Sequence, residues 1–175
     1  VLMNLFRRYL KCCERSAKKN QMRVKIIGDP GGLEPDIQRS ICELEDMSRD
    51  YDKMFFQIAL NYGGRDEILR AVTRLAEDDR QGKVPEGKVS EETFDSYLDT
   101  AGIPDPDLLI RTSGEQRLSN FLLWQLAYTE FYFTDVPWPA FDKKELAKAI
   151  EKYNERDRRY GGVKGQKPEE GASCL

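Results

Sequence analysis

Two arginines six residues apart in a short polar loop are the residues of this chain best suited to chemistry. Arg111 follows the apolar run Leu108–Ile110, which is short enough for a strand, and Arg117 precedes an apolar segment that begins at Phe121 and looks helical. A helix N-terminus offers free N–H groups and a positive dipole end to anions, and guanidinium groups grip phosphate oxygens in pairs. The pattern predicts a site for a phosphate ester or diphosphate. The alternative is an arginine loop that satisfies helix-end carbonyls or surface carboxylates.

Strands that alternate with helices must position this loop. The alternation predicts an α/β fold with a mostly parallel central sheet flanked by helices. The apolar run from Met54 to Leu60 is typical of a strand that is covered on both faces. Expected strands are 23–27, 54–60, 108–110 and 128–133, and expected helices start near residues 2, 35, 64, 91 and 143.

Apolar spacing predicts which face of each helix is buried. The inward residues expected in the four longer helices are Leu2, Leu5, Phe6, Tyr9, Leu10 and Cys13; Ile37, Ile41, Leu44 and Tyr51; Ile68, Leu69, Val72, Leu75 and Ala76; and Leu146, Ile150 and Tyr153. Ser90 and Asp142 have the character of N-caps. Ligands of such sheets bind at the carboxyl ends of strands, so the loops 28–32, 61–65 and 111–119 should open on one edge.

The composition is that of a soluble globular protein of single-domain size. The chain has 175 residues and a net charge of -3, which argues against a nucleic-acid partner. No apolar run approaches the ~20 residues that span a bilayer. Its cysteines, at positions 12, 13, 42 and 174, have neither metal-ligand spacing nor a disulfide framework. We therefore expect a reducing, cytoplasmic location.

Several segments carry a resemblance to a known family. Residues 111–125, followed by 127–133 and by Trp138-Pro139-x-Phe141, resemble the signature of the cis-prenyltransferases, and in particular bacterial undecaprenyl diphosphate synthase. Asn61-Tyr62-Gly63-Gly64-Arg65 and Arg158-Arg159-Tyr160-Gly161-Gly162 match two further family segments. The resemblance runs from the first residues to about Gly162, so we expect 1–162 to be the C-terminal portion of a single cis-prenyltransferase domain. The polar, glycine-rich residues 163–175 are expected to be disordered.

One departure from the family pattern bears on activity. The family opens with a loop of the type His-x-x-Met-Asp-Gly-Asn-x-Arg-Trp, whose aspartate is its key acidic residue, and continues with Phe-Ser-x-Glu-Asn-Trp-x-Arg-Pro. Neither segment occurs in these 175 residues, which contain no histidine. The sequence is therefore expected to be N-terminally truncated, with no catalytic residue of that segment present and with little activity of its own.

The resemblance implies a prenyltransferase that adds isopentenyl diphosphate to an allylic diphosphate such as farnesyl diphosphate. Each new double bond is cis, and the product is a polyprenyl diphosphate carrier lipid. Family residues that match Arg111, Arg117 and Ser119, with the backbone near Leu118, hold the diphosphate of the isopentenyl substrate. Bond cleavage develops negative charge on a diphosphate, so fixed cations are needed there. Glu115 is expected to orient one of the two arginines.

The resemblance also assigns the glutamate that matches Glu130 to Mg²⁺, which prefers hard oxygen ligands. The alternative for Glu130 is a salt bridge to a nearby arginine. Gly63 and Gly64 are interpreted as structural support rather than as a phosphate cradle, and Phe55, Phe56, Phe121 and Trp124 as core or product-tunnel lining.

The resemblance further implies a homodimer that meets the inner face of the membrane through its lipid product. In the family, an element like Arg159-Tyr160-Gly161 reaches the diphosphate site across a dimer interface; the alternative is a helix end that favours basic residues. Two other functions stay open. One is a non-catalytic partner subunit of a cis-prenyltransferase, and the other is an unrelated phosphate-binding α/β module.

Overall fold

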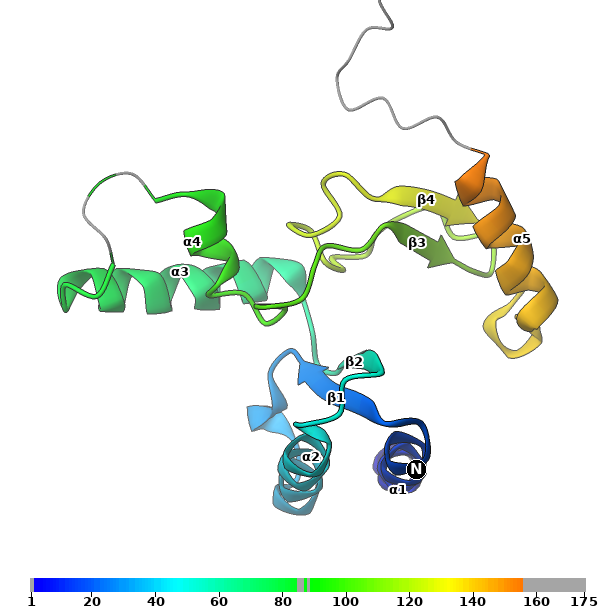
Figure 1. Ribbon diagram of the computed structural model, residues 1–175, viewed down its shortest axis with the longest axis horizontal. Coiled ribbons are helices and arrows are strands. Elements are labelled where there is room, and N and C mark those ends of the chain that lie inside the picture. Colours follow the sequence, from blue (N-terminus) through cyan, green and yellow to red (C-terminus); the bar gives the residue numbers. More distant parts are fainter. Residues whose placement is uncertain (1, 85–86, 88, 156–175) are drawn as a thin grey trace, which may run out of the picture. The chain divides into compact units, whose positions relative to one another are not determined.

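The computed structural model describes residues 2–84, 87 and 89–155. The chain forms two compact units, one of Val1–Pro106 with Leu118–Tyr128 and one of Asp107–Arg117 with the residues from Thr129 onward. Each unit contains a pair of parallel strands, as Figure 1 shows. The predicted α/β class with parallel strands is confirmed, although the strands form two separate pairs rather than one sheet.

Among its described residues, the first unit contains two strands and four α-helices. Its elements are α1 Leu2–Asn20, β1 Met22–Ile27, the 3₁₀ turn Pro30–Gly32, α2 Pro35–Ser48, β2 Met54–Ala59, α3 Gly64–Arg80 and α4 Glu91–Asp95. Helices α1 and α2 lie side by side against the β1–β2 pair (Figure 1). The buried core between them consists of Leu10, Cys13, Ala17, Met22, Val24, Ile37, Ile41 and Leu44.

The second unit contains β3 Leu108–Arg111, β4 Glu130–Phe133, the 3₁₀ turn Trp138–Ala140 and α5 Lys143–Asn154. Helix α5 packs on β4 (Figure 1). Both predicted N-caps are confirmed: the Ser90 hydroxyl accepts from the Thr93 N–H, and the Asp142 carboxylate accepts from the Lys144 and Glu145 N–H groups. Such caps satisfy donors that a helix cannot satisfy itself.

The edge of β1 that faces away from β2 is closed by side chains. The N–H of Val24 donates to Ser48 Oγ at 3.0 Å, and the N–H of Ile26 donates to Glu45 Oε1 at 2.7 Å. One step further, the N–H of Gly28 donates to Asp99 Oδ2 at 2.9 Å. Residues two apart on a strand share an edge, so these three bonds satisfy a row of donors that would otherwise invite further pairing.

Some predicted inward residues are exposed. Leu5 and Tyr9 of α1, Leu69 and Val72 of α3, Leu146 and Ile150 of α5, and Met54 and Phe55 of β2 are 43–67 % exposed. The apolar spacing correctly predicted an apolar stripe on each of these elements. In the structure, neighbouring elements cover only part of each stripe, so the remaining apolar side chains are exposed. The expectation that β2 is covered on both faces is wrong for the same reason, because α1 and α2 pack against only one side of the strand pair.

Gly28 occupies a backbone position that only glycine fits. Its φ is +111°, and a Cβ atom built there would lie 2.2 Å from the carbonyl oxygen of Leu60. Gly28→Ala is therefore expected to lower the free energy of unfolding by more than about 2 kcal/mol. Gly82→Ala is the matched control: φ is +69° there, but no atom lies within 4 Å of the added Cβ, so its cost should stay near 1 kcal/mol. Urea unfolding checks both, and equal losses would contradict the steric argument.

Candidate functional site

The loop after β3 is held by backbone hydrogen bonds to the loop after β4. The N–H of Ser113 donates to the Val136 carbonyl and the N–H of Gly114 to the Thr134 carbonyl, both at 3.0 Å. These amides therefore already have partners within the protein. An anion site in this loop would therefore depend on the loop's side chains rather than on the N–H groups of Ser113 and Gly114.

The predicted helix after the arginine loop is not observed. Residues 119–127 form a series of turns, and Ser119, Asn120 and Leu122 have φ values of 50°, 65° and 43°. Left-handed backbone of this kind cannot continue a right-handed helix. The expectation of a helix dipole aimed at the ligand is therefore wrong, and positive charge at this site comes from the arginines.

The two arginines differ in their surroundings. Arg117 forms an ion pair with Glu115, in which the arginine side chain is 66 % exposed. Exposed pairs of this kind are weak, so the Arg117 guanidinium is accessible to an anion from solution. Arg111 is half-buried at the end of β3, and within the described residues its guanidinium has neither an ion-pair nor a hydrogen-bond partner. A half-buried, uncompensated cation favours an external anion.

Leu118 and Ser119 continue directly from Arg117 but belong to the first unit. Leu118 is half-buried, and its carbonyl accepts from the Phe121 N–H at 3.1 Å, whereas the Ser119 side chain is exposed. The structure thus describes Arg111 and Arg117 in one unit and Leu118 and Ser119 in the other.

Asn120 attaches the segment 118–128 to the N-terminus of α3. Its carbonyl accepts from the Gly64 N–H at 2.7 Å, and its side-chain Oδ1 accepts from the Arg65 N–H at 3.0 Å. A Cβ on Gly64 would lie 2.9 Å from Leu123 Cγ, and one on Gly63 would lie 2.7 Å from Asn120 Nδ2. Both glycines permit this close approach, which agrees with their interpretation as structural support.

A buried carboxylate that the sequence reasoning missed lies one turn further along α3. Glu67 is fully buried, and its carboxylate accepts from the Asp99 N–H at 2.9 Å, from Gln125 Nε2 at 3.2 Å and from the Tyr62 hydroxyl. Gln125 Nε2 also donates to Thr100 Oγ1 at 3.0 Å. The only local signal was that Gly64, Glu67 and Ala71 share one helical face.

Asp99 joins this cluster to the end of β1. Besides accepting from the Gly28 N–H, its carboxylate accepts from Arg70 Nη1 at 3.0 Å and Nη2 at 2.7 Å. Burial opposes ionisation, but the hydrogen bonds from Arg70 and Gly28 outweigh it, and the pKa of Asp99 lies below its ordinary value. Asn61 also links the loops after β1 and β2, since its Nδ2 donates to the Asp29 carbonyl at 3.0 Å. The expectation that these two loops meet is confirmed.

The lowered pKa of Asp99 gives a test with a definite sign. A carboxyl group whose pKa is lower in the folded state stabilises the protein above its unfolded pKa of about 4, and this contribution is lost as pH falls through the folded value. Asp99→Asn should therefore unfold more easily at neutral pH and lose less further stability below pH ~4 than the parent. Asp50→Asn, at an exposed position, is the control. Parallel stability curves for parent and Asp99→Asn below pH ~4 would contradict the assignment.

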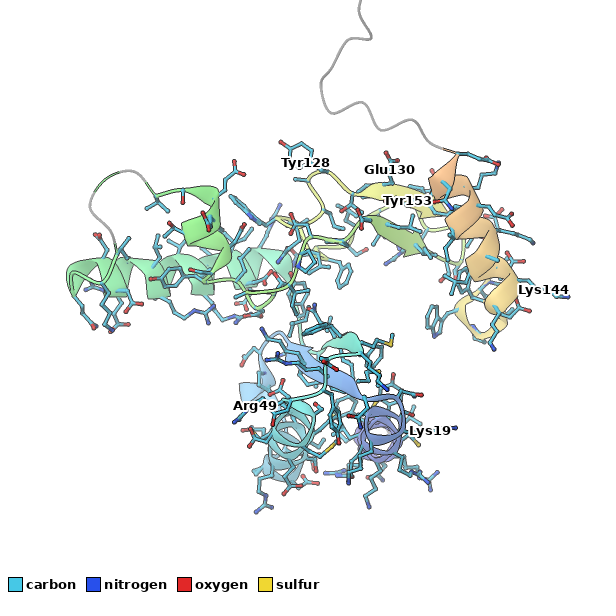
Figure 2. The ribbon with its side chains drawn as sticks, in the orientation of Figure 1. Lys19, Arg49, Tyr128, Glu130, Lys144 and Tyr153 are labelled. Atoms are coloured by element: carbon cyan, nitrogen blue, oxygen red, sulfur yellow. The ribbon has the colours of Figure 1, made fainter. Side chains whose placement is uncertain are left out.

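Glu130 opens β4, and its Cα pairs with that of Leu108 at the start of β3 (Figure 2). Its N–H donates to the Asp107 carbonyl at 3.1 Å. Arg111 lies three residues further along the paired strand, or about 10 Å at 3.3 Å per residue. The backbone thus places Glu130 and Arg111 at opposite ends of the β3–β4 pair.

The donor set at Glu130 fits magnesium only in part. A half-buried carboxylate is a suitable hard oxygen ligand. Residues 2–84, 87 and 89–155 contain no group of three or more His, Cys, Asp or Glu side chains arranged to hold a metal. A magnesium ion here would therefore take most of its ligands from water and from substrate phosphates, which is usual for this ion.

An apolar groove of about 450 Å³ runs along α1. Its lining includes Met3, Leu5, Phe6, Arg8, Tyr9, Cys12 and Leu60. Among the aromatic residues expected to be core or tunnel lining, Phe56 packs against the core of the first unit, whereas Phe55 is 52 % and Trp124 36 % exposed. Trp124 stacks edge-on with Phe94, and its Nε1 donates to Asp95 at 2.7 Å.

Two expectations concern C-terminal residues for which the structure gives no description. The element Arg159-Tyr160-Gly161 and the tail 163–175 lie outside the described residues. Within the described part of the chain, none of the helices combines the length and the apolar content that a membrane span requires.

Comparison with known protein families identifies a match over most of the chain. The sequence model of a family described as "Putative undecaprenyl diphosphate synthase" matches residues 1–161. An isoprenyl transferase of Fusobacterium nucleatum is 48 % identical over 164 residues, which are 94 % of this chain and 68 % of that protein. An isoprenyl transferase of Agrobacterium fabrum is 46 % identical over 165 residues, 94 % of this chain and 67 % of the relative. The chain thus spans about two thirds of the length of these relatives.

Solved structures agree with the sequence comparison. Lavandulyl diphosphate synthase from Lavandula x intermedia, crystallised with dimethylallyl diphosphate, has a TM-score of 0.86 at 37 % identity, over 92 % of this chain and 70 % of that one. A probable undecaprenyl diphosphate synthase from Campylobacter jejuni has a TM-score of 0.79 at 32 % identity, over 91 % and 73 %. The chain therefore belongs to the undecaprenyl diphosphate synthase family of isoprenyl transferases, a class of prenyltransferase enzymes.

Proposed function

We propose that this chain provides the isopentenyl diphosphate site of a cis-prenyltransferase that extends an allylic diphosphate such as farnesyl diphosphate. The observation that carries the proposal is Arg111, a half-buried guanidinium that no described residue neutralises. Arg117, which is exposed and paired with the Glu115 carboxylate, supplies a second cation in the same loop. Together they bring two positive charges to a diphosphate and offer paired N–H groups from which phosphate oxygens accept hydrogen bonds.

The chemistry assigns separate roles to the charged and apolar parts of the chain. Arg111 and Arg117 would hold the diphosphate of the isopentenyl unit, and Ser119 would donate a hydrogen bond to it beside the Leu118 backbone. Glu130 would hold Mg²⁺, which neutralises diphosphate charge when bound. The apolar groove on α1 would bind the growing prenyl chain, because transfer of an apolar chain out of water is favourable in free energy.

The proposal extends to the surroundings of the enzyme. We place it in the cytoplasm as a homodimer that touches the inner face of the membrane through its lipid product, a polyprenyl diphosphate carrier. A second candidate is a non-catalytic partner subunit.

Product formation tests the proposal. The complete gene product that contains residues 1–175 is incubated with farnesyl diphosphate, labelled isopentenyl diphosphate and magnesium, and lipid products are separated by chain length. We expect a ladder of long-chain polyprenyl diphosphates. Residues 1–175 alone should give none above a no-protein control. A complete gene product that binds isopentenyl diphosphate but elongates only when mixed with a second subunit would favour the partner-subunit function.

A further inference from the structure

We propose that the first unit carries a second anion site, formed by Arg23, Lys25 and Gln57, that takes a phosphate group, either of a free anion or of a lipid headgroup. The inference goes beyond the proposed function, because the residues of this site are not those of the arginine loop. The site is a cavity of about 200 Å³, and its further lining includes Phe55 and residues 101–103. All of these residues belong to the first unit.

The strand register places four of these side chains on one face of the β1–β2 pair. Arg23 is the Cα partner of Phe55, and Lys25 is the Cα partner of Gln57. Residues two apart on a strand point to the same side, so the four side chains form a square on that side. Val24, between the two cations, is buried in the core with α1 and α2. The square therefore faces away from these two helices.

The two cations of the square have no carboxylate partner. Among the described residues, neither Arg23 nor Lys25 forms an ion pair, although Lys25 is half-buried. Lys25 also lines a neighbouring cavity with Asp99, but that carboxylate already accepts two hydrogen bonds from Arg70. Two like charges thus lie about 7 Å apart along β1 without compensation, an arrangement that an anion between them would relieve.

The donors of this cavity suit a phosphate group. The Arg23 fork can donate two parallel N–H groups to phosphate oxygens, and the Lys25 ammonium acts as a point charge beside it. The guanidinium lies over the Phe55 ring, 5.6 Å from its centroid, which limits its orientations. Gln57 adds a neutral NH₂ donor. The volume is below the roughly 300–1,000 Å³ of pockets for drug-sized ligands, so it fits a single phosphate or diphosphate group.

The wall formed by residues 101–103 is fixed by hydrogen bonds. The N–H groups of Ala101 and Ile103 each donate to a backbone carbonyl three residues earlier in the chain, at 3.0 Å. Asp99 ties this turn to the end of β1, because its carboxylate accepts from the Gly28 N–H at 2.9 Å. The cavity is therefore formed before a ligand arrives, so binding does not require the wall to become ordered.

Calorimetric titration of inorganic diphosphate into the complete gene product tests the site. Every protein in this series carries Arg111→Ala and Arg117→Ala, so that the arginine loop does not contribute to binding. We expect this background to bind one diphosphate, and Arg23→Ala or Lys25→Ala to weaken that binding by about tenfold or more. Melting temperatures should stay those of the background, since neither side chain belongs to the core.

An isosteric change provides the decisive variant. Gln57→Glu places a carboxylate opposite Lys25, where it pairs with the ammonium and repels an anion, so diphosphate should bind at least as weakly as in Lys25→Ala. Gln81→Glu makes the same charge change at an exposed position after α3 and should keep the affinity within about twofold, because salt screens distant surface charges. Equal losses in both variants would show that only net charge matters and would overturn the site.

A second measurement separates a free anion from a lipid headgroup. The same proteins are sedimented with vesicles of phosphatidylglycerol or of phosphatidylcholine. Diphosphate binding that depends on Arg23 and Lys25 supports the site as one for a free anion. Sedimentation with phosphatidylglycerol alone, lost in Arg23→Ala and Lys25→Ala, supports it as a headgroup site.

The site is refuted if Arg23→Ala, Lys25→Ala and Gln57→Glu all match the background with both probes. The proposed function fails by a different result, namely a parent with intact arginines that neither binds isopentenyl diphosphate nor makes polyprenyl products. Because the two results come from different proteins and different ligands, one failure does not imply the other.

Discussion

Replacing Arg111 or Arg117 by alanine should lower kcat/KM for isopentenyl diphosphate by about 30- to 1000-fold in the complete gene product. Each substitution removes a charge-assisted contact to an anion that is withdrawn from water, which costs roughly 2–4 kcal/mol. Arg111→Ala should have the larger effect, because Arg111 is half-buried and has no partner among the described residues, whereas Arg117 is exposed and already paired with Glu115.

The lysine variants separate charge from geometry. Lysine retains the positive charge but cannot make the paired contacts of a guanidinium, so Arg111→Lys should recover only part of the lost activity. Arg39→Ala, at an exposed position of α2, is the control and should leave kinetics unchanged. If both alanine variants stay within threefold of the parent, these arginines are surface charges and the site lies elsewhere.

Glu130→Gln should reduce activity at low magnesium and regain part of it when magnesium is raised. The substitution preserves shape and removes the charge that would hold the ion. Loss of a partner outside the ligand shell of a metal already costs 10- to 100-fold in affinity or activity, so loss of a direct ligand should cost at least as much. Melting temperature should change little.

The structural alternative for Glu130 predicts the opposite pair of results. If the carboxylate serves a buried ion pair, Glu130→Gln leaves a charge without its partner and destabilises the fold by about 3–5 kcal/mol. A collapsed melting temperature with an unchanged dependence on magnesium would decide for that alternative. Glu130 lies about 10 Å along the strand pair from Arg111. The backbone therefore does not bring these two residues together, and the measurements on Glu130→Gln must decide between the metal role and the ion pair.

Local signals in the sequence predicted the elements well. Short apolar runs located all four strands, and a serine and an aspartate located two helix starts that the structure confirms at Ser90 and Asp142. These features depend on neighbours within a few residues, so a single sequence contains them.

Features that depend on distant partners were missed. Apolar spacing on α3 indicated Leu69 and Val72 as inward, yet the buried face contains Gly64, Glu67 and Ala71. The buried carboxylate of Glu67 is satisfied by hydrogen bonds from residues up to 58 positions away in the chain, namely Tyr62, Asp99 and Gln125. The helix expected after Arg117 failed similarly, because Asn120 binds the N-terminus of α3 instead of continuing a local ladder.

Calorimetric titration of isopentenyl diphosphate into the complete gene product is the most direct test of the diphosphate site. Parent, Arg111→Ala and Arg39→Ala are compared at matched concentration, with isopentenyl alcohol as the ligand that lacks the diphosphate. The arginine-loop assignment predicts binding by the parent and Arg39→Ala, binding at least 30-fold weaker by Arg111→Ala, and no measurable binding of the alcohol. Equal affinity of parent and Arg111→Ala for isopentenyl diphosphate, with both proteins folded, would contradict it.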